Sequence, residues 1–439
     1  MKGFLKIFSK INLKWLILVS IFLAGLAGGF LIFKASQKET VSPLPQNTYL
    51  SFILESYDTI KGNYWKAMTD AELANLFELG SETLMGVQYS LKTNDKSGVE
   101  LLAGKILKEL PEEKRKEYTT KLVSVILNSL SPAGRNALYS QQDEKDLADK
   151  VQNVNPGNDL YQNLGAETGA STEEIKTAYE AKVAELETQQ TPEAQEKLKE
   201  ATYAYNVLSD SSQKEKYDST GAEPTVFAKL LTSDIAHIYI KRFSPTTFEE
   251  FQNLAAGIAQ KGAPTALILD LRDNIGGSID LLPYFLGPFI GQNQYAYEFF
   301  HQGEYTPYKT KIGWIDSLTS YKTVVILVNG NTQSTAELMA STLKKYNVGV
   351  LVGTTTRGWG TIEKVFQLQN QIDTTEKYSM FLVHSLTLGE DNQPIESNGV
   401  APTININDQD WKEQLLKYFH YSALVTKVTE TWNQSPEEY

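Results

Sequence analysis

The chain has 439 residues, 41% of them hydrophobic, which is more than one compact domain holds and suits two or three domains. It contains no cysteine, so disulfides, thiolate metal sites and a lipid-bearing cysteine are excluded. The formal net charge is −12, and residues 1–40 hold six lysines against one glutamate, so the remainder is still more acidic and no nucleic-acid partner is predicted.

Residues 15–33, from Trp15 to Phe33, contain no charged side chain. At about 1.5 Å of rise per residue, a helix of this length just crosses the hydrocarbon core of a bilayer. Four lysines and no acidic residue precede the stretch, so the N-terminus is expected in the cytoplasm. A cleaved signal peptide is the alternative, but the small residues lie inside the apolar stretch rather than after it. We therefore predict that residues 1–46 form a single-pass cell-membrane anchor and a linker, with the bulk of the chain extracytoplasmic.

Residues 47–154 are predicted to form a helical segment. Pro111 is typical of the first position of a helix and starts one of its later helices. A turn at Asn155-Pro156-Gly157 separates this segment from the next one. Apolar residues recur at near-heptad spacing in its first part, at Leu50, Leu54, Tyr57, Ile60 and Tyr64.

Residues 155–222 contain two clear helix starts. Ser171 and Glu174 have the spacing of a capping box, and Thr191 followed by Pro192 suits a cap and a first helical residue. Two antiparallel helices are expected between the sequences DLYQNLG and AYNVLSDSSQKEKYD. A segment with this pattern resembles a J-domain of the DnaJ type, which implies a small all-α module.

The His-Pro-Asp signature of J-domains should follow the first long helix, where this chain has Glu187, Thr188 and Gln189. Without that signature, the resemblance implies that stimulation of a heat-shock ATPase is lost. We interpret the segment as a module for packing or docking, and a co-chaperone tether is the alternative.

Residues 223–408 contain three short apolar runs, each followed by a polar, glycine-rich loop. ALIL precedes DLRDNIGG, TVVILV precedes NGNTQSTAE, and VGVLV precedes GTTTRGWGT. Short continuous apolar runs bounded by turn residues are typical of buried parallel strands. Strand, loop and helix in repetition predict an α/β core with a parallel-rich sheet and crossover helices, and with its site beyond the strand C-termini.

Ser334 falls at the start of the helix that comes after the second run. The free N–H groups and the dipole of a helix N-terminus favour negative charge, so a serine there could attack a carbonyl with oxyanion donors at hand. The alternative is that Ser334 only caps the helix, because serine is a favoured N-cap residue.

The three loops resemble motifs of the tail-specific (C-terminal processing) serine proteases, which read DLR-N-PGG, VNGGSASASE and GETTFGKG. The resemblance extends from about Val226 to ESNGVAPT at residues 396–403. It implies a polypeptide substrate, Ser334 as nucleophile, and the N–H groups of Gly276 and Thr335 as oxyanion donors. It further implies that the helical segment contributes to a homodimer, although a helical subdomain without a partner is the alternative. The J-like helices occupy the place of the family's PDZ module, so recognition of C-termini by that module is not implied.

The general base of the family is missing. Its lysine falls on Trp359 and its glutamine on Glu363, and an indole N–H can only donate a hydrogen bond. Arg357 stays protonated, and strand alternation places Lys364 on the face opposite Trp359 and Glu363. Loss of a general base typically costs about 10²- to 10⁴-fold in rate.

Two hypotheses therefore stand. The first is a membrane-anchored serine-type peptidase that uses an unrecognised base, and the second is a pseudoprotease that binds peptides or partner proteins without cleaving them. His237 and His384 are expected to pack within the sheet, although either would replace the lysine if it lay beside Ser334. The four histidines lack the spacing of metal ligands, so no metal and no cofactor is predicted.

Residues 409–439 are predicted to form a C-terminal helix and a polar tail. The helix is amphipathic, begins near Trp411 and is expected to dock on the core through Leu415, Leu416 and Phe419.

Overall fold

The computed structural model describes residues 48–189 and 191–436. The predicted membrane anchor at residues 15–33 lies outside this part of the chain. Among the residues described, no helix has the length and apolar character needed to cross a bilayer.

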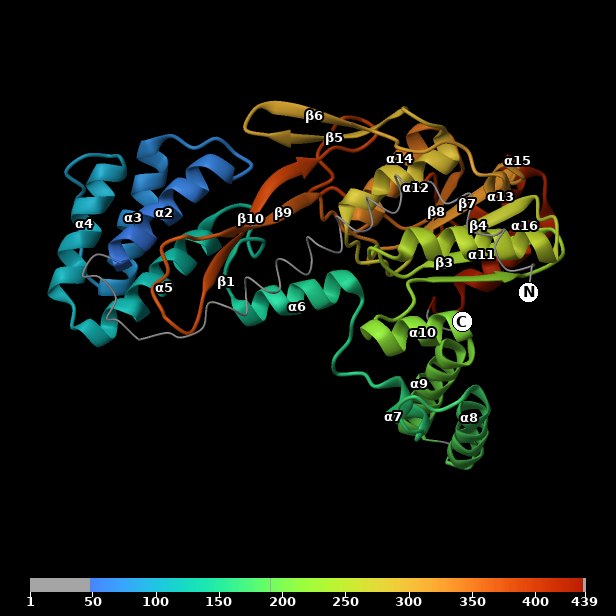
Figure 1. Ribbon diagram of the computed structural model, residues 1–439. Helices are drawn as coiled ribbons and strands as arrows, with labels where there is room; N and C mark the ends of the chain where they lie inside the picture. The colour runs from blue at the N-terminus through green and yellow to red at the C-terminus, as the bar shows by residue number, and fades with distance from the viewer. Residues whose placement is uncertain (1–47, 190, 437–439) are drawn as a thin grey trace, which may run out of the picture. The chain divides into compact units, whose positions relative to one another are not determined.

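The N-terminal part is helical, as its apolar spacing predicts, and its helices lie side by side in Figure 1. They bury a shared core around Phe52, Tyr57 and Phe77. Thr69 and Glu72 form a capping box at the start of the second helix, and Pro111 directly precedes the fourth. The helices are α2 (Thr48–Asn63), α3 (Asp70–Met85), α4 (Lys96–Glu109) and α5 (Glu112–Ser129).

This helical core is completed by residues far along the chain. A five-stranded antiparallel sheet has the order β1-β10-β5-β6. The fifth strand, β9, also pairs with β10. Leu368, Ile372, Met380 and Leu382, from β10 and the segment before it, pack into the helical core. The helical segment therefore shares its core with a hairpin that the sequence pattern did not link to it. The strands are β1 (Ala137–Ser140), β5 (Tyr295–His301), β6 (Glu304–Lys309), β9 (Thr361–Gln367) and β10 (Tyr378–Thr387).

Residues 159–220 form a small all-α module. Ser171 and Glu174 form the predicted capping box, and Thr191 caps the helix that starts at Pro192. The two long helices pack around Ile175, and Tyr179 stacks on Tyr205 with ring centroids 4.2 Å apart. The helices are α7 (Leu160–Leu164), α8 (Thr172–Glu187), α9 (Pro192–Ser209) and α10 (Ser211–Thr220), and α6 (Gln141–Gln152) precedes them.

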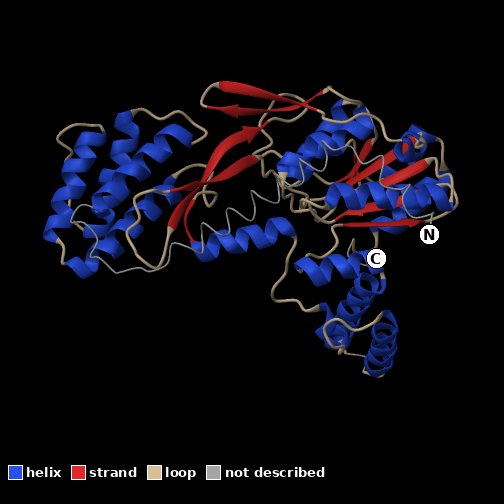
Figure 2. Ribbon diagram, in the orientation of Figure 1, coloured by secondary structure: helices blue, strands red, loops and turns tan. Residues whose placement is uncertain are grey.

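A six-stranded sheet forms the centre of the α/β core, drawn in red in Figure 2. Its order is β11-β8-β7-β4-β3-β2, and every pair is parallel except β2 with β3. The predicted runs become β4, β7 and β8. The strands are β2 (Val226–Leu230), β3 (Ile235–Ile240), β4 (Ala266–Asp270), β7 (Thr323–Val328), β8 (Val350–Gly353) and β11 (Ile404–Asn405).

Helices cover both faces of this sheet, which explains why its central strands β4, β7 and β8 are largely continuous apolar runs. Along β7, Ile326 packs into the cluster that contains residues of α11, α12 and α14, whereas Val325 and Leu327 pack into the cluster formed with α15 and α16. The covering helices are α11 (Thr247–Lys261), α12 (Leu282–Ile290), α14 (Thr335–Lys345), α15 (Trp411–Phe419) and α16 (Ser422–Trp432), with the short η2 (Ile279–Leu281) and α13 (Asp316–Thr319) between them.

The predicted helix from Trp411 is present as α15 and packs through Leu415 and Phe419, but Leu416, expected to dock, is exposed. The prediction for the residues after this helix is wrong. The predicted polar tail contains α16, which buries Leu424 and Val428 against the sheet. Leu424, Val428 and Trp432 recur at a spacing of four residues, so the sequence did carry the signal of an amphipathic helix.

Arg272 joins the end of α16 to the sheet. Its guanidinium is paired with the fully buried Asp270 at 2.6 Å and donates to the carbonyl oxygens of Thr431, Trp432 and Gln434 at 3.0 to 3.2 Å. Burial alone would raise the pKa of Asp270, but hydrogen bonds from His237 and Arg272 outweigh it and lower that pKa.

Replacing Arg272 with methionine should therefore leave a buried carboxylate without its cation. We expect Arg272→Met to lower the free energy of unfolding by about 3 to 5 kcal/mol, measured by urea denaturation. Lys427→Met removes a partly exposed ion pair with Glu430 and should cost no more than about 1 kcal/mol. Equal stability of the Arg272 variant and the wild type would contradict this assignment.

Candidate active site

Ser334 lies between the end of β7 and the first residue of α14, as the sequence predicts. Its backbone has φ 57° and ψ −125°, a conformation that is strained for a residue with a side chain. The turn before it is fixed, because Thr332 Oγ1 donates to the Leu271 carbonyl at 2.8 Å and the Gln333 N–H donates to the Asn274 carbonyl at 2.9 Å. Ser334 is half-buried, so the strained turn presents a hydroxyl at the helix N-terminus.

The buried carboxylate of Glu337 binds this turn to the loop after β8. One oxygen accepts the N–H groups of Ser334 and Trp359 at 2.9 and 2.8 Å. The other accepts the Thr356 hydroxyl and the Gly358 N–H at 2.5 and 2.7 Å. Burial raises the pKa of Glu337, and these four hydrogen bonds oppose the shift.

Gly276 lies directly against Ser334. A Cβ atom at Gly276 would approach Ser334 Cβ to 2.6 Å, and its φ of 83° also favours glycine. Its N–H, however, donates to the side-chain oxygen of Asn274 at 2.8 Å. The amide expected to bind an oxyanion is therefore engaged within its own loop.

The backbone N–H of the next residue, Gly277, differs from that of Gly276 in its hydrogen bonding. The backbone N–H of Phe243 donates to Gly276, and the Ser278 N–H donates to Phe243, so these two neighbours face Phe243. The Gly277 carbonyl accepts the Thr335 hydroxyl at 2.9 Å, which places Gly277 beside the start of α14. Within residues 48–189 and 191–436, the N–H groups of Gly277 and Thr335 have no acceptor, which makes them the two amides available beside Ser334.

Trp359 and Glu363, at the positions of the family lysine and glutamine, contact each other. The indole N–H donates to a Glu363 carboxylate oxygen at 3.2 Å, and the Thr361 hydroxyl donates to the same oxygen at 2.6 Å. Burial raises the pKa of Glu363. Thr361 and Glu363 thus lie on one face of β9, and the indole of Trp359, two residues before the strand, reaches the same side.

Arg135, which the sequence analysis did not single out, covers the indole of Trp359. Its guanidinium carbon lies 3.6 Å from the ring centroid, the geometry of a cation–π contact. The same guanidinium makes two hydrogen bonds of 3.1 Å to Glu396 and one of 2.7 Å to Thr361. Trp359 and Glu363 thus belong to a connected group of side chains that also includes Arg135, Thr361 and Glu396.

Neither histidine considered as a base contacts Ser334. His237 is buried and hydrogen-bonded to Asp270 at 3.3 Å, and burial lowers its pKa. His384 is bonded to Ser385 and to Lys364, and burial lowers its pKa to about 4. In the part of the chain that the structure describes, no side chain is hydrogen-bonded to the Ser334 hydroxyl.

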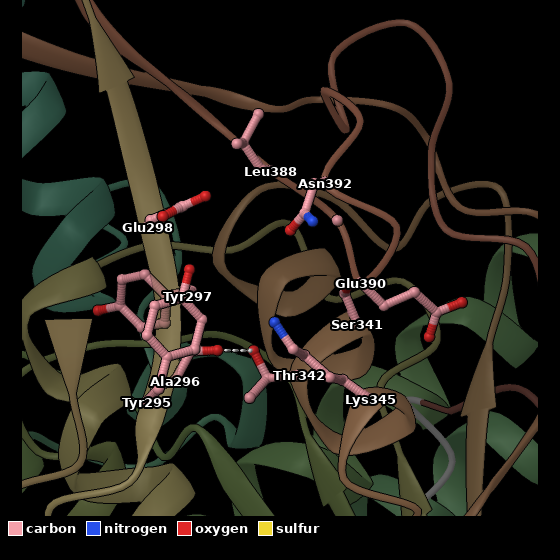
Figure 3. A pocket seen from close by; sticks show the side chains of 11 residues that line it. Tyr295, Ala296, Tyr297, Glu298, Ser341, Thr342, Lys345, Leu388, Glu390 and Asn392 are labelled. Carbon is pink, nitrogen blue, oxygen red and sulfur yellow. Dashed lines mark hydrogen bonds between the residues drawn. The ribbon is translucent and has the colours of Figure 1, made fainter. Parts of the chain in front are cut away.

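Figure 3 shows a cavity at the other end of α14. Thr342 and Lys345 face Tyr295 and Ala296 of β5 there, around a space of about 10 Å³. That volume is about what a single water molecule needs.

Residues 234–406 match the family model described as Peptidase family S41, and residues 159–218 match the DnaJ domain. The chain carries a tail-specific protease core and a DnaJ-type module. The protease core includes every residue of the site except Arg135.

Three relatives illustrate the match. Over 189 residues the chain is 29% identical to the "Carboxy-terminal processing protease CtpA" of Bacillus subtilis, covering 43% of this chain and 38% of the relative. Over 176 residues it is 25% identical to the "Carboxy-terminal-processing protease" of Bartonella bacilliformis, covering 39% and 38%. Over 66 residues it is 47% identical to the "Chaperone protein DnaJ" of Leifsonia xyli, covering 15% and 18%. The matches thus span less than two fifths of each relative's length.

Removing the guanidinium of Arg135 tests how much this side chain contributes to the stability of the group around Trp359. Arg135 and Glu396 are only 13% and 11% exposed. Arg135→Met should therefore cost about 2 to 3 kcal/mol of unfolding free energy, between the values for exposed and buried pairs.

Urea denaturation measures that cost, and tryptophan fluorescence should change because the cation leaves the indole face. Lys145→Met, which removes an ion pair with the helix neighbour Asp149, serves as the control with a change below about 1 kcal/mol. An Arg135 variant as stable as this control would show that the contacts of Arg135 with Trp359 and Glu396 do not stabilise the fold.

Proposed function

We propose that this chain is a polypeptide-binding member of the tail-specific protease family whose serine site is formed but has lost its general base. It binds extended peptides beside Ser334 without cleaving them. A single-pass anchor at residues 15–33 places the bulk of the chain outside the cytoplasm, a location that rests on the sequence pattern.

One observation carries this function: the Ser334 hydroxyl has no side-chain hydrogen-bond partner among the described residues. Attack on a peptide carbonyl requires that the hydroxyl proton pass to a base within about 3 Å. The family lysine would supply that base, and Trp359 takes its place with its N–H directed at Glu363. An indole cannot accept the proton.

A second candidate, an active serine-type peptidase, is favoured by the other half of the site. Ser334 keeps its strained turn, and the Gly277 and Thr335 amides are free to bind an oxyanion. Water could then accept the proton inefficiently, giving slow turnover. The two candidates share the same binding site and differ only in rate.

Placing a lysine at position 359 distinguishes the two candidate functions. Ser334 should react with a fluorophosphonate probe very slowly in the wild type, and Trp359→Lys should raise the labelling rate by about 10²-fold or more because a base returns. The adduct should disappear in the double variant with Ser334→Ala.

Trp359→Met is the matched control, since it removes the indole without adding a base. An equal gain in this variant would mean that the indole only blocks access to the serine. Fast labelling of the wild type, together with peptide cleavage that Ser334→Ala abolishes, would show an active peptidase and contradict the proposed loss of the base.

A further inference from the structure

Arg357 lies in the loop between β8 and β9, two residues before Trp359. Its side chain is exposed, and its backbone N–H donates to the Thr332 carbonyl at 2.9 Å. Thr332 precedes Ser334 by two residues, which is at most about 7 Å of extended chain. The side chain of Arg357 therefore starts from the immediate surroundings of the serine.

The loop that carries Arg357 is fixed on both sides. Thr356 before it and Gly358 after it both donate to Glu337, the residue that also holds the Ser334 N–H. The Gly358 carbonyl accepts the Ser397 N–H at 2.9 Å. The backbone from which the Arg357 side chain extends is thus held at a defined place relative to the serine.

Arg357 differs from the other four arginines of the chain, each of which has a hydrogen-bond acceptor. Among the described residues, no carboxylate or carbonyl accepts from the Arg357 guanidinium. In a chain of net charge −12, a cation left unpaired beside a serine site is available to a ligand. The acceptors of the other four are Leu110 for Arg115, Glu396 for Arg135, Lys150 for Arg242 and Asp270 for Arg272.

We propose that Arg357 is a specificity-determining residue that selects polypeptides presenting a carboxylate close to the position held at Ser334. The planar guanidinium fork suits a carboxylate, which a glutamate or aspartate side chain or a free C-terminus could supply. This inference rests on the proposed function, because it names the substrate class of the same site. It holds whether the peptide is cleaved or only bound.

The test measures peptide binding to the full-length Ser334→Ala protein, so that turnover cannot interfere. Fluorescein-labelled unstructured peptides are compared by anisotropy in matched pairs, with glutamate against glutamine at each position in turn, and with a free against an amidated C-terminus. An exposed ion pair of about 1 kcal/mol predicts that the preferred carboxylate peptide binds about fivefold more tightly than its neutral twin. The difference should shrink at high salt.

Arg357→Gln should abolish that preference, and Arg357→Lys should retain part of it. Lys197→Gln, which removes one exposed charge from the DnaJ-type module, should leave the preference unchanged. The peptide pair that shows the preference tells whether the carboxylate belongs to an acidic side chain or to a free C-terminus.

Binding of all peptides with no charge preference, or a preference that survives in Arg357→Gln, would overturn the role of Arg357 and leave the proposed function intact. Absence of binding to every peptide would overturn both.

Discussion

The buried carboxylate of Glu337 holds the site together. It is fully inaccessible to solvent, and a buried carboxylate is costly unless its oxygens are hydrogen-bonded. Here four donors satisfy it, two of them main-chain N–H groups of the loop after β8 and one the N–H of Ser334. The strained serine turn and the loop that carries Arg357 and Trp359 are therefore positioned by one side chain.

The surroundings of Ser334 and those of Trp359 are built differently. On the serine side lie the strained turn, the close approach of Gly276, and the Gly277 and Thr335 amides, which have no acceptor among the described residues. On the other side, Trp359 has partners of its own, because Glu363 accepts its N–H and Arg135 covers its ring. Trp359 is thus embedded in a network of side chains rather than isolated.

Features set by local pattern could be predicted from the sequence. The apolar run of β7 predicts a buried parallel strand because both faces of the sheet are covered, and the caps at Ser171 and Thr191 predict the helix starts of the DnaJ-type module. Ser334 was found because a serine after a strand and before a helix is itself a local pattern.

Features set by contacts across the fold could not be predicted in this way. Nothing near Arg135 in the sequence indicates that it stacks on Trp359, and nothing near Met380 indicates that it completes a helical core. The Gly277 amide is an intermediate case. Asparagine side chains often accept the backbone N–H two residues on, as Asn274 accepts that of Gly276, so the unpaired amide is expected one residue later, at Gly277.

Amide hydrogen exchange in wild-type protein and Glu337→Gln, measured residue by residue by NMR, tests the central role of this carboxylate. Glutamine offers one acceptor oxygen where the carboxylate offers two, so at least one pair of donors loses its partner. Loss of a hydrogen bond of about 1 to 1.5 kcal/mol should speed exchange at the affected amides among Ser334, Gly358 and Trp359 by about tenfold. Unchanged protection of all three would show that the two segments are held together by something other than Glu337.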